Sequence, residues 1–89
     1  MTDRAHENFV NVIQVSVGRS ASSPDFFWNR YPGRRGEVRQ LSNGNAEYEY
    51  FWGGRDYGKC IVYWEVDIRS DKVVAARFEG TRDTCYLVP

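Results

Sequence analysis

The feature that most constrains the fold is a pair of cysteines placed beside two strand-like segments. Cys60 begins an alternating apolar run that ends at Ile68, and Cys85 follows a second such run, from Val73 to Gly80. Alternation of apolar and polar residues is typical of half-buried strands, and two such strands joined by a short turn form a hairpin. We therefore expect the two sulfur atoms to meet at the open end of that hairpin and to form a disulfide.

A structural disulfide indicates an oxidising compartment, because cytosolic thiols are kept reduced. The first eight residues are mainly polar and lack the apolar segment of a signal peptide. We interpret the sequence as the mature portion of an exported protein. We expect it in the periplasm or at the inner face of the outer membrane, associated with the membrane only through a lipid anchor in a removed leader. The alternative is a cytosolic protein with two reduced thiols.

With 89 residues the chain forms one domain. We expect a mobile segment at residues 1–8 and a single folded domain at residues 9–89. A chain of this size buries only about 60% of the surface that its unfolded form exposes. Three Trp, six Tyr and five Phe compensate for this thin core, since each ring buries a large area.

The net charge and the scarcity of metal-binding residues limit the classes of partner and ligand that we expect. Twelve basic residues balance twelve acidic ones, so no net field draws the molecule to nucleic acid or to an anionic membrane. The only histidine is His6, and the two thiols fit none of the four-ligand zinc spacings. We expect no metal and no cofactor.

The C-terminal two thirds of the chain read as a four-stranded antiparallel meander. The expected strands cover residues 35–41, 46–52, 60–68 and 73–80. Between the first two lies Asn43-Gly44, which favours a two-residue hairpin turn because both residues tolerate positive φ. The turns that follow cover residues 53–58 and 69–72.

Alternation also predicts how the strands align. The apolar residues of the last two strands share a face if Val66 opposes Val74, Trp64 opposes Ala76 and Val62 opposes Phe78. On this face we also expect Ile68 and three aromatic residues of the second strand, Tyr48, Tyr50 and Trp52. The register places Cys60 opposite Gly80, and a turn at residues 81–84 can return Cys85 to it.

An aromatic sheet face needs a cover, and only the two N-terminal segments can supply it. Residues 9–17 fit a helix or a strand; we favour a short helix that becomes extended before Gly18. Ser22 and Ser23 precede Pro24 and Asp25, an order typical of a helix start. We expect a second helix at residues 24–31, with Phe27 and Tyr31 on one face. The fold class is therefore α+β, with one or two short N-terminal helices packed on the sheet.

The sequence resembles small proteobacterial envelope lipoproteins of the SmpA/OmlA-like kind. The resemblance covers residues 17–87 and rests on an Asn-Gly-Asn hairpin in an aromatic context, a Cys-containing strand ending in Val-Asp, and a short strand before a second Cys, at residues 39–50, 60–67 and 73–85. It implies two helices against an antiparallel sheet, as in β-lactamase-inhibitor-type domains. The sequence departs from that family in having no lipobox cysteine.

Three possible chemistries each have a simpler interpretation. Glu47 lies opposite Glu65 in the expected register, as in a carboxylate pair for acid–base catalysis, but a solvated sheet face explains both better. Gly53, Gly54 and Gly58 could form an anion-binding nest, but turns use glycine more often. An arginine cluster beside aromatic rings could bind phosphate or bases, although charge balance is simpler: Arg30, Arg34, Arg35 and Arg39 with Trp28 and Tyr31.

A protein-binding surface is the functional prediction that remains. Phe51, Ile61 and Tyr63 should group on the sheet face away from the helices, where apolar side chains have no cover. The edge strands offer a second route, by strand addition. We expect a non-enzymatic envelope domain that binds another envelope protein. The alternative is a secreted or periplasmic inhibitor that inserts the loop of residues 53–58, with Arg55 and Tyr57, into the cleft of an enzyme.

Overall fold

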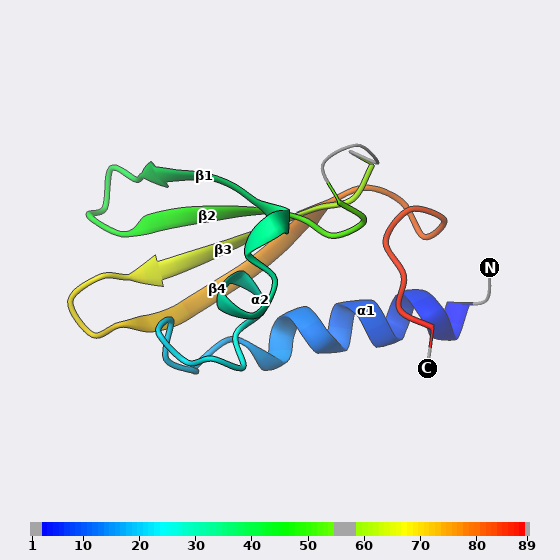
Figure 1. Ribbon diagram of the computed structural model, residues 1–89, viewed down its shortest axis with the longest axis horizontal. Coiled ribbons are helices and arrows are strands. Elements are labelled where there is room, and N and C mark those ends of the chain that lie inside the picture. The colour runs from blue at the N-terminus through cyan, green and yellow to red at the C-terminus, as the bar shows by residue number, and fades with distance from the viewer. Residues whose placement is uncertain (1–2, 55–58, 89) are drawn as a thin grey trace.

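The computed structural model describes residues 3–54 and 59–88 and has the expected α+β architecture. An antiparallel sheet with the strand order β1-β2-β3-β4 is covered on one face by a long helix and a short one (Figure 1). The strands are β1 (Arg35–Gln40), β2 (Ala46–Phe51), β3 (Ile61–Asp67) and β4 (Lys72–Glu79). The predicted meander is confirmed, and its observed strands lie within one or two residues of the expected ones.

Helix α1 (Asp3–Val15) is longer than predicted and begins earlier. Ala5, Phe9 and Ile13 are spaced four residues apart, so they share one helical face, and all three are buried against the sheet. Residues 3–8 are therefore the first turns of this helix, which contradicts the expectation of a mobile segment there. The strand alternative for residues 9–17 is also wrong, since Val15 points away from the core and is exposed.

Helix α2 (Phe27–Arg30) is a single turn, and a 3₁₀ turn, η1 (Pro32–Arg34), follows it. The expected start at Pro24 is wrong because the serine before it acts in a turn: the Ser23 hydroxyl accepts from the Asp25 backbone N–H at 3.2 Å. Asn29 fastens this turn by donating to the carbonyl oxygens of Ala21 and Ser23 at 2.7 and 2.9 Å. Phe27 stacks on Tyr31 as predicted, with ring centroids 5.8 Å apart.

The hairpin between β1 and β2 has a three-residue loop instead of the expected two-residue turn. The Leu41 N–H donates to the Asn45 carbonyl at 2.8 Å, and the Gly44 N–H donates to the Leu41 carbonyl at 3.1 Å. Gly44 has φ +90°, whereas Asn43 does not have positive φ. A three-residue loop needs positive φ only at its last position, where glycine carries no steric cost.

The strand register agrees with prediction except at the β3–β4 turn. Trp64 opposes Ala76 and Val62 opposes Phe78, as expected. Val66, however, opposes Val73, because a β-bulge inserts Val74 as an extra residue. The bulge turns Val73 into the core and leaves Val74 exposed, and Ile68 lies beyond the sheet and is exposed too.

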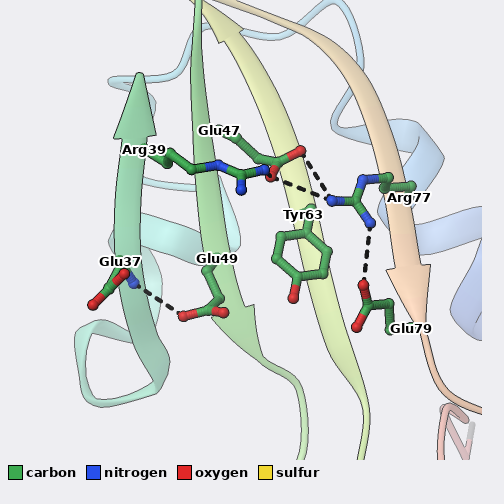
Figure 2. A pocket seen from close by; sticks show the side chains of 7 residues that line it. All are labelled: Glu37, Arg39, Glu47, Glu49, Tyr63, Arg77 and Glu79. Carbon is green, nitrogen blue, oxygen red and sulfur yellow. Dashed lines mark hydrogen bonds and ion pairs between the residues drawn. The ribbon is translucent and has the colours of Figure 1, made fainter. Parts of the chain in front are cut away.

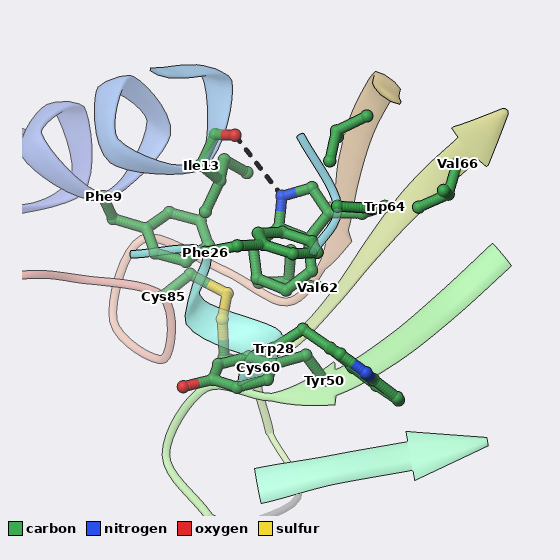
Figure 3. Close-up of a cluster of buried hydrophobic side chains, with 12 residues drawn as sticks. Phe9, Ile13, Phe26, Trp28, Tyr50, Cys60, Val62, Trp64, Val66 and Cys85 are labelled. Atoms are coloured by element: carbon green, nitrogen blue, oxygen red, sulfur yellow. Dashed lines mark hydrogen bonds between the residues drawn. A yellow bond between two sulfur atoms is a disulfide. The ribbon is translucent and has the colours of Figure 1, made fainter. Parts of the chain in front are cut away.

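The core lies between the helices and β2–β4 and is mainly aromatic (Figure 3). Trp64 is at its centre, fully buried, with its ring 4.8 Å from that of Phe26 and 5.3 Å from that of Tyr50. The Cys60–Cys85 disulfide is present, with the two Cα atoms 5.2 Å apart, so this prediction is confirmed. Both cysteines are buried among the aromatic rings, where they close one end of the core.

The C-terminal segment packs along the first turns of α1 (Figure 1). The Cys85 N–H donates to the Thr81 carbonyl at 2.8 Å, which completes the turn that returns the chain to the sheet. Beyond this turn the Leu87 N–H donates to the Ala5 carbonyl at 2.9 Å, and Trp52 Nε1 donates to the Tyr86 carbonyl at 2.9 Å. The disulfide-bearing tail therefore joins the helix to the sheet.

Candidate functional site

A shallow hollow lies on the face of the sheet opposite the helices, and all four strands contribute to it (Figure 2). Its volume is about 190 Å³, and seven side chains line it: Glu37, Arg39, Glu47, Glu49, Tyr63, Arg77 and Glu79. All of them point to this face because side chains alternate along a strand and the intervening residues face the helical layer. We call this surface the outer hollow.

Glu47 is a well-shielded carboxylate of the outer hollow. Its side chain is 12% exposed and accepts from Arg39 Nη2 at 2.7 Å and from Arg77 Nη2 at 3.3 Å. Guanidinium groups from strands on both sides of β2 therefore share one carboxylate. The arrangement fixes the two arginines across the width of the sheet.

Arg77 connects this ion pair to Tyr63, the one aromatic ring among the described residues that line the hollow. Its guanidinium carbon lies 4.1 Å from the centroid of the Tyr63 ring, and Nη1 lies 3.5 Å from Glu79 Oε1. Burial raises the pKa of the Tyr63 phenol, and the charges of Glu79 and Glu49 raise this pKa further. Tyr63 therefore stays protonated at neutral pH and offers a hydrogen-bond donor among carboxylates.

The side chain of Glu49, on β2, extends over β1 at a β-bulge. Gly36 and Glu37 together oppose Glu49, and the Glu37 backbone N–H donates to Glu49 Oε1 at 3.2 Å. A Cβ atom at Gly36 would lie 2.8 Å from Glu49 Cγ, so the absence of a side chain there gives the carboxylate its path. The glutamate therefore replaces a backbone acceptor where the bulge interrupts the β1–β2 ladder.

The carboxylate pair predicted from the sequence is present, but its two members have different partners. Glu47 opposes Glu65 in the register. Asn45 Nδ2 and Asn43 Nδ2 donate to Glu65 Oε2 at 2.7 and 3.0 Å, and these hydrogen bonds lower the pKa of Glu65. A general acid needs a raised pKa, so the lowered pKa of Glu65 does not suit this residue to the role of the general acid in such a pair.

The apolar residues predicted on this face occupy the expected positions with less exposure than expected. Phe51 opposes Ile61, and Tyr63 follows two residues further along β3. All three are half-buried, and the Arg77 guanidinium covers one face of the Tyr63 ring. Arg55 and Tyr57, the residues expected in an inserted loop, lie outside the described residues.

The arginines that the sequence groups together are divided between the two layers. Arg30 and Arg34 lie over the Tyr31 ring, and Arg34 Nη1 donates to the Trp52 carbonyl at 2.6 Å. Arg35 lies over the Trp28 ring and donates to the carbonyl oxygen of Trp28 at 2.6 Å. Arg39 alone of the four lines the outer hollow. The structure therefore does not form the single arginine cluster that binding of phosphate or bases would need.

The charge pattern of the outer hollow is not among the features predicted from the sequence. Four glutamates and two arginines line it, which leaves two negative charges in excess on one face of a chain that is neutral overall. The strand register alone predicts part of this charge pattern, since it places Arg77 opposite Tyr63 and Glu79 opposite Ile61. Two bulges set the rest of the arrangement; the one in β1 contains Gly36, a residue typical of bulges, whereas no glycine marks the one at Val74.

Comparison with protein-family models, with curated proteins and with solved structures found no match to this chain. Across residues 3–54 and 59–88, no helix combines the length and apolar character needed to cross a membrane. Within the same ranges, no three His, Cys, Asp or Glu side chains gather as potential ligands of a metal ion.

Proposed function

We propose that this protein is a non-enzymatic domain of the cell envelope that binds another protein through the outer hollow. It would be related to the small SmpA/OmlA-like envelope lipoproteins. The observation that carries the proposal is the composition of the uncovered sheet face. There Tyr63, a half-buried ring with an available hydroxyl, is surrounded by ion pairs that are already formed.

Such a surface suits protein recognition. Tyrosine and arginine are enriched where proteins bind one another, because both combine a large apolar area with directional hydrogen bonding. Glu47 already holds Arg39 and Arg77 in place, so the two side chains lose less entropy on binding than free ones would. With two negative charges in excess, the hollow favours a partner segment that carries lysine or arginine.

The disulfide supports the location. Cys60 and Cys85 are bonded and fully buried, and a bond of this kind is stable in the periplasm and in secreted proteins. The alternative function, a secreted or periplasmic enzyme inhibitor, would use the same compartment. It would place Arg55 and Tyr57 in the partner's cleft, with the outer hollow free.

The experiment compares three forms of the purified, disulfide-bonded protein. A Phe51→Ser/Tyr63→Ser variant removes the two rings of the outer face, and Tyr31→Ser removes an exposed ring of the helical layer as a matched control. Each form is crosslinked in an envelope extract, captured proteins are identified, and the affinity of the leading candidate is measured with the purified pair. We expect the double variant to lose at least about tenfold in affinity and the control to bind normally.

Circular dichroism and thermal unfolding of each form separate lost binding from lost folding. Equal affinity of the native protein and a folded double variant would contradict the outer hollow as the binding surface. If, in addition, substitution of Arg55 and Tyr57 abolished binding, the inhibitor alternative would replace this proposal.

A further inference from the structure

The two edges of the sheet differ in how their backbone groups are satisfied. On β4 the segment before α2 acts as a short additional strand: the Gly18 N–H donates to the Val73 carbonyl at 2.7 Å and the Val73 N–H donates to the Arg19 carbonyl at 2.9 Å. Gln14 Nε2 reaches the Ala76 carbonyl further along, at 3.4 Å. This edge is therefore partly covered by the chain itself.

The β1 edge is exposed. Its last four residues, from Glu37 to Gln40, are all exposed, and Val38 retains 55% of its surface although its side chain is apolar. Leu41 and Asn45 form a hydrogen-bonded pair in the hairpin. Since hydrogen-bonded and non-hydrogen-bonded pairs alternate in an antiparallel ladder, the N–H and C=O groups of Val38 and Gln40 point away from β2, toward the open edge.

The sequence of this edge is complementary to itself. An antiparallel pairing of two β1 strands centred on Val38 places Val38 opposite the same residue of the second copy. The acidic residue before it, Glu37, then lies opposite Arg39 of the second copy, and Arg39 lies opposite Glu37 of that copy. Opposite charges directly across a strand pair stabilise it, and the two-fold symmetry supplies each contact twice.

We propose that two copies of this chain associate through their β1 edges to form a continuous eight-stranded sheet. Val38 is the centre of the interface, where its backbone exchanges two hydrogen bonds with its symmetry mate and its exposed side chain becomes covered. The two-fold axis is perpendicular to the sheet, so both outer faces lie on the same side. The inference stands independently of the envelope partner.

Side-chain positions in the single chain already fit this pairing. Glu37 and Arg39 both line the outer hollow, so they lie on the same face of the sheet, as a cross-strand pair requires. Among the described residues the Glu37 carboxylate has no ion pair, and the Arg39 side chain is 68% exposed while it contacts Glu47. A guanidinium has five N–H donors, so Arg39 can bind a second carboxylate without releasing the first.

The pairing would also join the two outer hollows. Each contains Glu37 and Arg39 at its β1 rim, so the rim of one hollow would be completed by residues of the other copy. The contact is small because only two edge strands meet, which places it among weak associations, with a dissociation constant in the micromolar to millimolar range. Association would weaken as salt screens the paired charges.

The first test is sedimentation equilibrium of the disulfide-bonded protein and of two charge variants, at protein concentrations up to about 1 mM. Glu37→Arg alone places like charges opposite each other in the pair of strands, and so does Arg39→Glu alone. We expect each variant to associate about tenfold more weakly than the native chain. A mixture of the two variants restores both opposite-charge pairs, so it should form a mixed dimer with about the native affinity.

The second test does not depend on the charges. Val38→Cys places a thiol opposite its symmetry mate, at a Cα separation of about 5.5 Å that a disulfide can span. Val74→Cys on the other edge strand is the matched control, since Val74 is an exposed valine too. We expect Val38→Cys to form a covalent dimer under mild oxidation much faster than the control, with the buried Cys60–Cys85 bond intact.

Three outcomes would overturn the inference. The first is a native chain that stays monomeric over the whole concentration range while Val38→Cys crosslinks no faster than Val74→Cys. The second is a dimer whose affinity is unchanged by the single charge substitutions. The third is a mixture of the two charge variants that stays monomeric although each variant is folded by circular dichroism. If β1 paired only with an extended segment of another protein, the purified chain would stay monomeric, which is the first outcome.

Discussion

The imidazole Nδ1 of His6 lies 2.8 Å from the carbonyl oxygen of Cys85. The same ring stacks on Phe9 and meets the edge of Phe78, so it sits between helix, sheet and tail. The only histidine of the chain thus has a structural role, since it joins the first turns of α1 to the segment that the disulfide holds against the sheet.

Loss of the disulfide should therefore lower the stability of the whole domain, because the bond also holds the tail that His6 contacts. A Cys60→Ala/Cys85→Ala variant reopens a loop of 25 residues. By the chain-entropy estimate the bond contributes about 3 kcal/mol, a large part of the stability of a domain this small. Urea unfolding of the variant and of the native protein measures the difference in the free energy of unfolding. A difference below about 1 kcal/mol would contradict the structural role of the bond.

Gly80 should be the least replaceable glycine of the described chain. It has φ +150°, and a Cβ atom there would lie 2.5 Å from Cys85 Sγ and 2.8 Å from the Lys59 carbonyl oxygen. Neither neighbour can move freely, because the disulfide fixes Cys85 Sγ and Lys59 directly precedes the disulfide-bonded Cys60. Gly80→Ala should therefore lower the free energy of unfolding by about 2 kcal/mol or more.

Gly33→Ala is the matched control for this substitution. A Cβ atom at Gly33 meets nothing within 4 Å. We expect it to change the melting temperature by no more than a few degrees, whereas Gly80→Ala should lower it clearly. Equal melting temperatures for the two variants would show that the tail does not pass as close to the sheet as described.

A pH-dependent contribution is expected from Asp71. Its carboxylate accepts from the Ser20 hydroxyl at 2.5 Å and from the Ser22 hydroxyl at 2.6 Å, and these hydrogen bonds lower the pKa of Asp71. Asp71 also has φ +56°, which asparagine tolerates well. Asp71→Asn therefore removes the charge while it preserves the turn.

The direction of the change in stability with pH follows from the lowered pKa of Asp71. The hydrogen bonds favour the ionised form in the folded state, so the contribution of Asp71 is fully present above its unfolded pKa of about 3.9. It is lost as the pH falls through the lower folded pKa. Native protein should be more stable than Asp71→Asn at about pH 6, and the two should converge near pH 2 in urea unfolding. A difference that stays constant across this range would contradict the hydrogen-bonding role.

Strand order, most of the register and the disulfide could be predicted because each depends on strong local signals. Alternation placed Trp64 opposite Ala76, and this register brought Cys60 near the returning tail. The face that Val74 occupies could not be predicted. A bulge shifts the register by one residue at this position, and no nearby glycine or proline marks it. The start of α1 at Asp3 could not be predicted from sequence periodicity. Its first turns are stabilised by tertiary contacts of Ala5 and His6 with the C-terminal tail.

The candidate site was predicted only in part for the same reason. Register was enough to place Phe51, Ile61 and Tyr63 on one face. The ion pairs that Glu47 makes with Arg39 and Arg77 join three strands, so they depend on side-chain reach as well as on register. The Arg77 guanidinium lies over the Tyr63 ring, and this contact could not be derived from the position of Tyr63 alone.

The measurement that tests the account most directly is the affinity of the purified envelope partner for the native protein and for Phe51→Ser/Tyr63→Ser, by titration calorimetry. Tyr31→Ser is measured beside them. The account predicts a loss of at least about tenfold for the double variant and none for the control, with all three forms folded. Equal affinity of all three would contradict the claim that the protein binds its partner through the outer hollow.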